Sequence, residues 1–409
     1  MARKIEFGIN LNPRHELGQP ADASILRGLR WVRVVFAAAS LGRPVEQALT
    51  FYDQVVARYR AANVRTLFVL NGETFWGHAP WDHGDWERYA GDFSRIAGQI
   101  AAHYTGQGVA YEIWNEGDVR GHSSIYVPPA GYAALLAQTS AAIRAADPNA
   151  PVIFGGLAAD LDAAVTYVQT VRDQLGGSLP VDALGVHPYG KWPPNFSETP
   201  AWGGWFGPLE PHLQRLLDEF PALKLWITEV GISEPVPFPR SQYPMVIKHM
   251  RGVYDLIQRQ FWSRIPVAIW FAWSDIMRNA GIVDGQGQPK PELYDTFFAL
   301  ARSEPPPAPE PAKVPLPDPA SVTIPPRSLI EPTERLNMRA EPMISSRLVA
   351  VLDAGAPLTV IEPWADACLK LGCTGYWINV VTGDNQVGWV AAWLVRLADP
   401  AADPVPSEV

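Results

Sequence analysis

The sequence has few cysteines, no excess of positive charge and no long apolar run, and each absence excludes a class of protein. Its 409 residues carry a net charge of -9, which argues against nucleic acid as a partner because phosphate binding needs a basic surface. No stretch is apolar over the roughly 20 residues that a transmembrane helix needs, so we expect no membrane span. Charged residues make up 18% and hydrophobic residues 47%, which excludes a disordered chain and allows a large core.

The two cysteines, Cys368 and Cys373, lie close together near the C-terminus. Their spacing suits a hairpin disulfide in an oxidising compartment, and it suits two free thiols in a small β-domain as well. A zinc site would need more ligands than this segment offers. The sequence therefore leaves the state of these cysteines open.

Short apolar runs recur along the first 300 residues and are typical of strands buried on both faces, as in a parallel sheet covered by helices. Eight of them are the expected strands: 5–10, 31–36, 65–70, 109–114, 152–156, 183–189, 224–230 and 267–273.

Segments with helical spacing follow the strands. The expected helices are 21–29 (the shortest), 44–62, 85–104, 128–146, 161–175, 209–220, 242–263 and 291–301. Eight β-then-α units predict a (β/α)8 TIM barrel, an α/β fold, over residues 1–302. The alternative, a doubly wound open sheet, is disfavoured because no phosphate-cradling glycine-rich turn follows the first strand.

The composition changes abruptly after the barrel. Residues 303–327 are rich in proline and predict an extended linker. Residues 328–398 alternate apolar and polar side chains between glycine-centred turns, which predicts a small all-β barrel. Residues 399–409 are expected to form a flexible tail.

Ionisable residues gather where the expected strands end, and in a parallel barrel the chemistry lies at that rim. Glu116 follows the fourth strand and Glu229 ends the seventh, on the opposite side of the barrel. Two carboxylates across a barrel mouth suit cleavage of a glycosidic bond, one as acid and the other as nucleophile or base. A retaining enzyme holds them about 5–5.5 Å apart and an inverting one about 6.5–9.5 Å.

The segments Ile113-Trp114-Asn115-Glu116 and Trp226-Ile227-Thr228-Glu229 resemble the two catalytic motifs of glycoside hydrolase clan A. That clan has a (β/α)8 barrel and a retaining mechanism. The resemblance implies that Glu116 is the acid/base and Glu229 the nucleophile. Many members have proline after the acid/base, where this chain has Gly117. The spacing is loosely similar to family 39 and its relatives, without fixing the family.

The same resemblance implies roles for residues near the two glutamates. Asn115 would hydrogen-bond the sugar 2-hydroxyl. Arg33, an arginine among apolar neighbours in the second strand, would pair with the nucleophile and keep it ionised. His187 and Tyr189 correspond to the strand-six residues beside the nucleophile.

Three further residues are candidate sugar contacts. Trp273 resembles the strand-eight platform under the sugar. Asn71 and Trp76 lie on the long loop after the third strand, where loops set specificity in such barrels. Aromatic residues there either wall a glycan cleft or pack the loop onto the barrel. Neither a metal nor a cofactor is expected.

The C-terminal β region resembles a bacterial SH3-like domain. This resemblance rests on two segments, Leu336-Asn337-Met338-Arg339-Ala340-Glu341-Pro342 and Val387-Gly388-Trp389-Val390. Such domains often bind cell-wall peptides or peptidoglycan, so the cell wall is an expected partner. This implies an extracellular or cell-envelope protein whose export signal this sequence does not include, with the cytoplasm as the alternative.

Together these features predict a monomeric, retaining glycoside hydrolase that acts on a β-linked polysaccharide or oligosaccharide. Two alternatives remain open: a non-hydrolytic glycan- or cell-wall-binding protein on a barrel scaffold, and a peptidoglycan-directed hydrolase.

Overall fold

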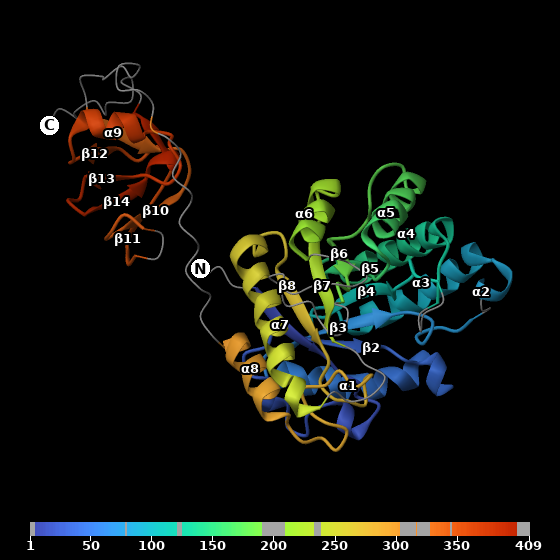
Figure 1. Cartoon of the computed structure of the whole chain (residues 1–409). Helices are drawn as coiled ribbons and strands as arrows, with labels where there is room; N and C mark the ends of the chain where they lie inside the picture. Colours follow the sequence, from blue (N-terminus) through green and yellow to red (C-terminus); the bar gives the residue numbers. More distant parts are fainter. Residues whose placement is uncertain are drawn as a thin grey trace. The chain divides into compact units, whose positions relative to one another are not determined.

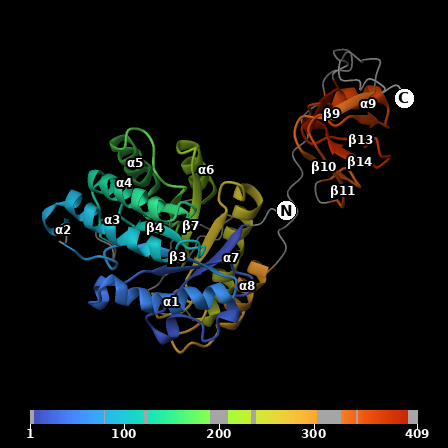
Figure 2. The same cartoon turned by 180° about the vertical axis from the view of Figure 1, so that it is seen from behind.

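A computed structural model of the chain describes residues 5–77, 80–120, 125–189, 209–232, 239–302, 316, 328–343 and 346–398. The chain separates into two compact units, Met1–Pro305 and Pro306–Val409, shown in Figures 1 and 2. The predicted linker, apart from residue 316, and the predicted tail lie outside the described residues.

The first unit is a closed barrel of parallel strands, each hydrogen-bonded to the next, with β8 pairing back to β1. This confirms the predicted TIM-barrel fold. The strands are β1 (Glu6–Asn10), β2 (Trp31–Val35), β3 (Arg65–Leu70), β4 (Ala110–Asn115), β5 (Val152–Leu157), β6 (Ala183–Val186), β7 (Lys224–Gly231) and β8 (Val267–Phe271).

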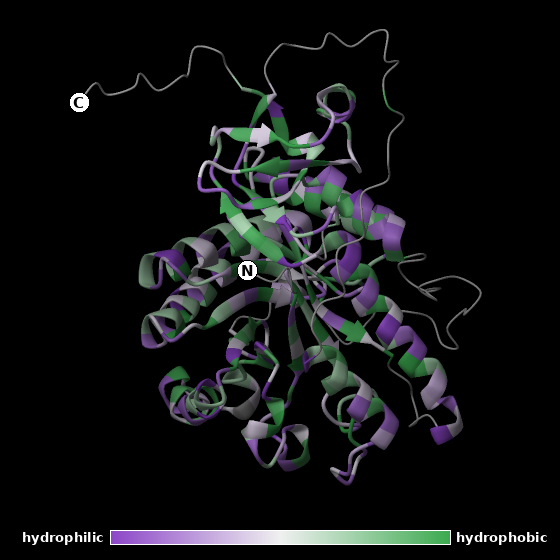
Figure 3. Cartoon of the chain, turned by 90° about the vertical axis from the view of Figure 1, so that its left-hand side faces the viewer, coloured by the Kyte–Doolittle hydropathy of each residue, from purple (hydrophilic) through white to green (hydrophobic). Residues whose placement is uncertain are grey.

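Helices surround the barrel, and Figure 3 shows hydrophobic and hydrophilic residues alternating along them, as in amphipathic helices with one face on a sheet. Asp85 caps α3 by accepting from the N–H of Arg88, and Asp160 caps α5 by accepting from Ala163. The helices are α1 (Val45–Ala61), α2 (Pro80–His83), α3 (Trp86–His103), α4 (Pro129–Ala146), α5 (Leu161–Gln174), α6 (Leu209–Glu219), α7 (Tyr243–Leu256) and α8 (Pro291–Arg302).

Two of the predicted helices differ from the structure. The expected helix at 21–29 is only the 3-10 turn Ala23–Leu26, because the chain turns at Gly28, where φ is +106°, to enter β2. The expected helix at 242–263 ends in a π-helical turn, Ile257–Phe261, after α7.

The barrel interior has two layers of different chemistry. The lower layer is an apolar floor built from β2 to β8: Trp31, Leu67, Ala110, Ile153, Ala183, Trp226, Val267 and Ile269. Its two indoles, Trp31 and Trp226, contact each other with ring centroids 5.0 Å apart. Arg33 and Glu112 come two residues after the floor residues of β2 and β4, so their side chains point to the same side of each strand. They lie above the floor and are buried.

The second unit is an antiparallel sheet with strand order β11-β10-β14-β13-β12-β9-β15. Its apolar core includes Ile330, Met338, Ile378 and Val390. The strands are β9 (Leu329–Pro332), β10 (Leu336–Arg339), β11 (Leu348–Leu352), β12 (Leu358–Val360), β13 (Trp377–Val381), β14 (Val387–Ala391) and β15 (Val395–Leu397). A short α-helix, α9 (Trp364–Lys370), lies between β12 and β13 in the sequence.

Both cysteines of this unit are free thiols in the structure. Cys368 lies buried in α9, and burial raises the pKa of its thiol. Cys373 donates its S–H to the carbonyl of Leu369. In the part of the chain that the structure describes, no helix is long and apolar enough to cross a bilayer.

Gly131 allows α4 to lie close to α3. A Cβ at this position would meet the indole of Trp86 at 2.5 Å, so Gly131→Ala must displace either the indole or the helix. We expect the free energy of unfolding to fall by about 1–3 kcal/mol, as for other overpacked sites. Denaturant unfolding measures this.

Gly91→Ala in α3 is the matched control. Its added Cβ would meet only the Gln138 side chain, at an ordinary 3.6 Å, so it should stabilise the helix by about 0.5–1 kcal/mol. Equal effects of the two substitutions would contradict this account of the α3–α4 packing.

Candidate active site

The end of β4 carries a local break in the strand that turns Glu116 into the barrel mouth. Regular alternation would place Trp114 on the same side as Glu112. Instead Trp114 has φ of +75°, and its indole packs outside the sheet against Trp86 and Phe93 of α3. Glu116 has φ of +49°, and its N–H donates to the carbonyl of Gly156 on β5. Two strained residues thus set the direction of this carboxylate.

Arg33 is the hub of the buried polar layer. Its Nε donates to Glu112 Oε2 at 2.5 Å, and its Nη1 donates to Glu229 Oε1 and, at 3.0 Å, to Asn10 Oδ1. Its Nη2 donates to Asn115 Oδ1 at 2.7 Å. Burial alone would lower the pKa of Arg33, but the carboxylates of Glu112 and Glu229 outweigh it and raise that pKa. A permanent positive charge therefore lies against Glu229.

Tyr189 holds the other oxygen of Glu229. Its hydroxyl donates to Glu229 Oε2 at 2.6 Å. Burial, followed by the charge of Glu229, raises the pKa of Tyr189 well above its ordinary value, so the phenol keeps its proton and remains a donor. Both oxygens of Glu229 are therefore fixed, one by a guanidinium and one by a phenol.

His187 contacts the second glutamate. Its Nδ1 lies 3.0 Å from Glu116 Oε1 and 3.9 Å from Glu229 Oε2, and its Nε2 lies 3.0 Å from Thr228 Oγ1. Burial alone would lower the pKa of His187, but Glu229 and Glu116 outweigh it and raise that pKa. The ring therefore holds a proton more readily than a free imidazole does.

Two glycines make room for this layer. A Cβ at Gly156 would lie 2.0 Å from His187 Nε2, and a Cβ at Gly185 would lie 2.9 Å from Glu112 Oε1. Because these two positions are glycine, β5 and β6 leave space for the imidazole and the carboxylate.

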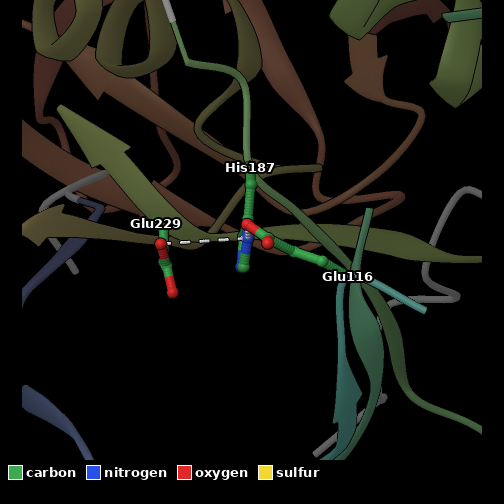
Figure 4. A group of neighbouring side chains, drawn as sticks. All are labelled: Glu116, His187 and Glu229. Atoms are coloured by element: carbon green, nitrogen blue, oxygen red, sulfur yellow. Dashed lines mark hydrogen bonds and ion pairs between the residues drawn. The ribbon is translucent and has the colours of Figure 1, made fainter. Parts of the chain in front are cut away.

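Glu116, His187 and Glu229 form a triangle at the mouth, drawn in Figure 4. One carboxylate oxygen of each glutamate and one nitrogen of His187 lie within 4.8 Å of one another. These atom types would also suit a metal ion. The adjacent guanidinium of Arg33 and the His187–Glu116 hydrogen bond favour an acid–base pair instead, because a cation would have to displace or oppose both.

The structure brings six of the predicted site residues into one network: Arg33, Asn115, Glu116, His187, Tyr189 and Glu229. The predicted sixth strand ends early, at Val186, so His187 and Tyr189 lie just beyond β6, where the N–H of Tyr189 donates to the carbonyl of His187. Pro188 lies between them and has no N–H to continue the strand.

The other three predicted residues have different surroundings. Asn71 accepts from the N–H of Glu73 in the turn after β3. Trp76 is 51% exposed on the same loop, with its ring 4.9 Å from that of Trp81. Trp273 follows β8, which ends at Phe271 rather than at the predicted 273, and its ring is buried 6.2 Å from that of Tyr294.

Asn10, Glu112 and Thr228 belong to the network but were not predicted as site residues. Asn10 Oδ1 accepts a hydrogen bond from Arg33 Nη1, and Thr228 Oγ1 donates to Glu112 Oε1 at 2.8 Å. Glu112 lies inside β4, away from the strand end, whereas Asn10 and Thr228 lie at or near the ends of β1 and β7 but carry no ionisable group. Glu112 had one usable signal: a lone carboxylate in an otherwise apolar strand, with Arg33 in another.

The raised pKa of His187 predicts how its substitution changes stability with pH. Protonation stabilises the fold fully below about pH 6.5, the unfolded value, and this contribution is lost as the pH rises through the higher folded value. His187→Gln should therefore cost more free energy of unfolding at about pH 5.5 than at about pH 9. Denaturant unfolding of parent and variant at both pH values checks this.

His212→Gln is the contrasting control. Burial, followed by Arg215, lowers the pKa of His212, so its protonation favours the unfolded chain. This variant should gain stability relative to the parent as the pH falls below about 6.5. The same pH trend for both variants would refute the assignment of His187 as the site that retains a proton.

Comparison with known proteins gives one family match. Residues 334–396 match the family described as Bacterial SH3 domain, which confirms the predicted identity of the second unit. No curated protein matches the sequence.

Solved structures similar to the chain include several glycoside hydrolases. A family 39 glycoside hydrolase from the gut symbiont Bacteroides cellulosilyticus WH2 is 15% identical with a TM-score of 0.53, covering 95% of this chain and 81% of that one. A family 5 xyloglucanase from Paenibacillus pabuli is 13% identical with a TM-score of 0.54, covering 73% and 99%. A family 1 β-glucosidase from Thermotoga maritima is 12% identical with a TM-score of 0.52, covering 74% and 99%. At this identity the likeness shows the fold: the barrel shares its architecture with glycoside hydrolases, and a bacterial SH3 domain follows it.

Proposed function

We propose that the chain is a retaining glycoside hydrolase, with Glu229 as nucleophile and Glu116 as acid/base. The observation that carries this proposal is the pair of carboxylates at the barrel mouth, with oxygens within 4.8 Å of each other. The two carboxyl groups are therefore close together, which supports direct attack by one of them: retaining enzymes hold the groups about 5–5.5 Å apart, and inverting enzymes about 6.5–9.5 Å apart to admit a water. The glycoside hydrolases that share the fold support the same reaction class.

In the first step a Glu229 oxygen attacks the anomeric carbon. Arg33 donates to one of its oxygens and Tyr189 to the other, and these two hydrogen bonds orient the carboxyl group. The bond from the anomeric carbon to the leaving oxygen breaks, and that oxygen takes the proton of Glu116. The product is a glycosyl ester of Glu229 and a released alcohol.

In the second step Glu116 is a carboxylate and acts as base. It removes a proton from water, whose oxygen attacks the anomeric carbon and breaks the ester to Glu229. The sugar leaves with its original anomeric configuration, and both glutamates return to their starting forms. His187, 3.0 Å from Glu116 Oε1, orients this carboxyl group in both steps.

The substrate is a β-linked polysaccharide or oligosaccharide. Asn115, whose side chain is held by Arg33 Nη2, is proposed to hydrogen-bond the sugar 2-hydroxyl. Trp76 offers an exposed indole on the rim for an apolar sugar face. Trp273 and Asn71 are proposed as further contacts, from the loops after β8 and β3.

The bacterial SH3 domain favours a second candidate, a hydrolase directed at the cell wall. Such a domain would hold the barrel near wall peptides or peptidoglycan and would raise the local concentration of an attached glycan. Under this candidate, and under the first, the protein works outside the cell or in the cell envelope.

The test is product release from aryl β-glycosides, β-glycans and purified cell wall. Glu229→Ala should reduce turnover to background, because no nucleophile remains. Glu116→Ala should lower kcat/KM by about 10²–10⁴-fold on poor leaving groups, and azide should partly restore cleavage of aryl glycosides. Proton NMR of the first-formed product should show the β-anomer.

Glu87→Ala is the matched control, since it removes an exposed carboxylate of α3 that accepts from the side chain of Gln138. It should retain parental turnover. A folded parent that binds glycans yet cleaves none, and equals both active-site variants, would reject the enzyme and support the glycan-binding alternative. Cleavage confined to purified wall would select the wall-directed candidate.

A further inference from the structure

Glu112 is a fully buried carboxylate to which the proposed reaction assigns no step. Its side chain has 0% exposure, beneath the two glutamates of the mouth. One oxygen, Oε2, accepts from Arg33 Nε at 2.5 Å, and the other, Oε1, accepts from Thr228 Oγ1 at 2.8 Å. Both oxygens of Glu112 therefore act as hydrogen-bond acceptors.

Thr228 has one hydroxyl proton, and that proton points to Glu112. Its oxygen can then only accept from other neighbours. His187 Nε2 lies 3.0 Å from this oxygen. The contact is favourable only if Nε2 carries a hydrogen, because an unprotonated Nε2 would face a second acceptor.

With Nε2 protonated, the variable proton of His187 is at Nδ1. That atom lies 3.0 Å from Glu116 Oε1, the oxygen of the proposed acid/base. We propose that Glu112 and Thr228 are positioning residues that lock the hydrogen on His187 Nε2, so that Nδ1 and Glu116 share a single proton. The inference deepens the proposed function and rests on it for the role of Glu116.

The shared proton affects both halves of the reaction. When Glu116 is the acid, neutral His187 accepts from it or shares its proton. Once the leaving oxygen has taken that proton, the Glu116 carboxylate faces an unprotonated Nδ1, which places two acceptors 3.0 Å apart. This arrangement favours recovery of a proton from the attacking water, so the lock strengthens Glu116 as base.

Other charges around the imidazole agree with a retained proton. Among the described residues, the charged groups that face His187 are Glu112 and Glu116 from β4 and the turn after it, Asp118 further along that turn, Glu229 from β7 and Arg33 from β2. The neutral phenol of Tyr189 also contacts the ring. The carboxylates outnumber the one cation.

Two substitutions should each move the hydrogen of the His187 ring from Nε2 to Nδ1, through different contacts. Thr228→Val removes the acceptor of Nε2–H, and Arg33 Nη2, 3.5 Å away, can then donate to an unprotonated Nε2. In Glu112→Gln the amide oxygen can face Arg33 and the amide N–H can face Thr228, which turns the threonine proton toward Nε2. Either change moves the hydrogen to Nδ1.

The experiment records ¹⁵N chemical shifts of labelled histidine without substrate. His187→Gln identifies which of the 8 histidines gives the signal. The parent should show a protonated Nε2 on His187, and Thr228→Ser, which keeps the hydroxyl, should show the same. Thr228→Val and Glu112→Gln should each show the hydrogen moved to Nδ1.

Turnover adds a second readout. Thr228→Val should lower kcat/KM about 10²-fold on glycosides with poor leaving groups, and much less on activated aryl glycosides that need no proton. Thr228→Ser should restore the parental pattern. A purely structural defect would lower both substrate types alike.

An unprotonated Nε2 in the parent would overturn the inference, as would an unchanged tautomer in folded Thr228→Val. Failure of the proposed function is distinguishable, because the parent would then lack turnover while its His187 shifts could still be read.

Discussion

The pairing of Arg33 with two buried carboxylates is the interaction on which the rest of the site depends. One guanidinium links Glu112, deep in the barrel, to Glu229 at its mouth, and also reaches Asn10 and Asn115. Removing one partner of such a group leaves an unpaired charge in a poorly solvated interior, typically at about 3–5 kcal/mol. The directions of Glu229 and Asn115 therefore follow from where β2 places a single side chain.

The backbone around this group is shaped to admit it. Gly156 and Gly185 leave space for an imidazole and a carboxylate, and Trp114 and Glu116 adopt positive φ to bring the fourth-strand carboxylate inward. Non-glycine residues in that region cost of order 1–3 kcal/mol each. The large apolar cluster between the strands and the helices over-determines these conformations. The packing of the barrel therefore offsets the conformational cost of the strained residues in the site.

Much of the fold follows from the sequence, because strands buried on both faces leave continuous apolar runs such as that of β3. Strand ends are less predictable. β6 ends at Val186 because Pro188 has no N–H to donate and the N–H of Tyr189 bonds locally to the carbonyl of His187. The glutamates were predictable because Glu116 follows strand four and Glu229 lies near the end of strand seven. Glu112 and Thr228 were not, because their roles depend on proton directions that only the assembled layer defines.

The apolar floor of the barrel, with Trp31 and Trp226 in contact, has a consequence for solvent. It closes the lower end of the interior with side chains that cannot pass a proton. Exchange between water and the buried charges must therefore go through the mouth, past Glu116 and Glu229. A sugar bound at the mouth would exclude water from it and lower the local dielectric constant. Every charge contact beneath it would then strengthen only while the site is occupied.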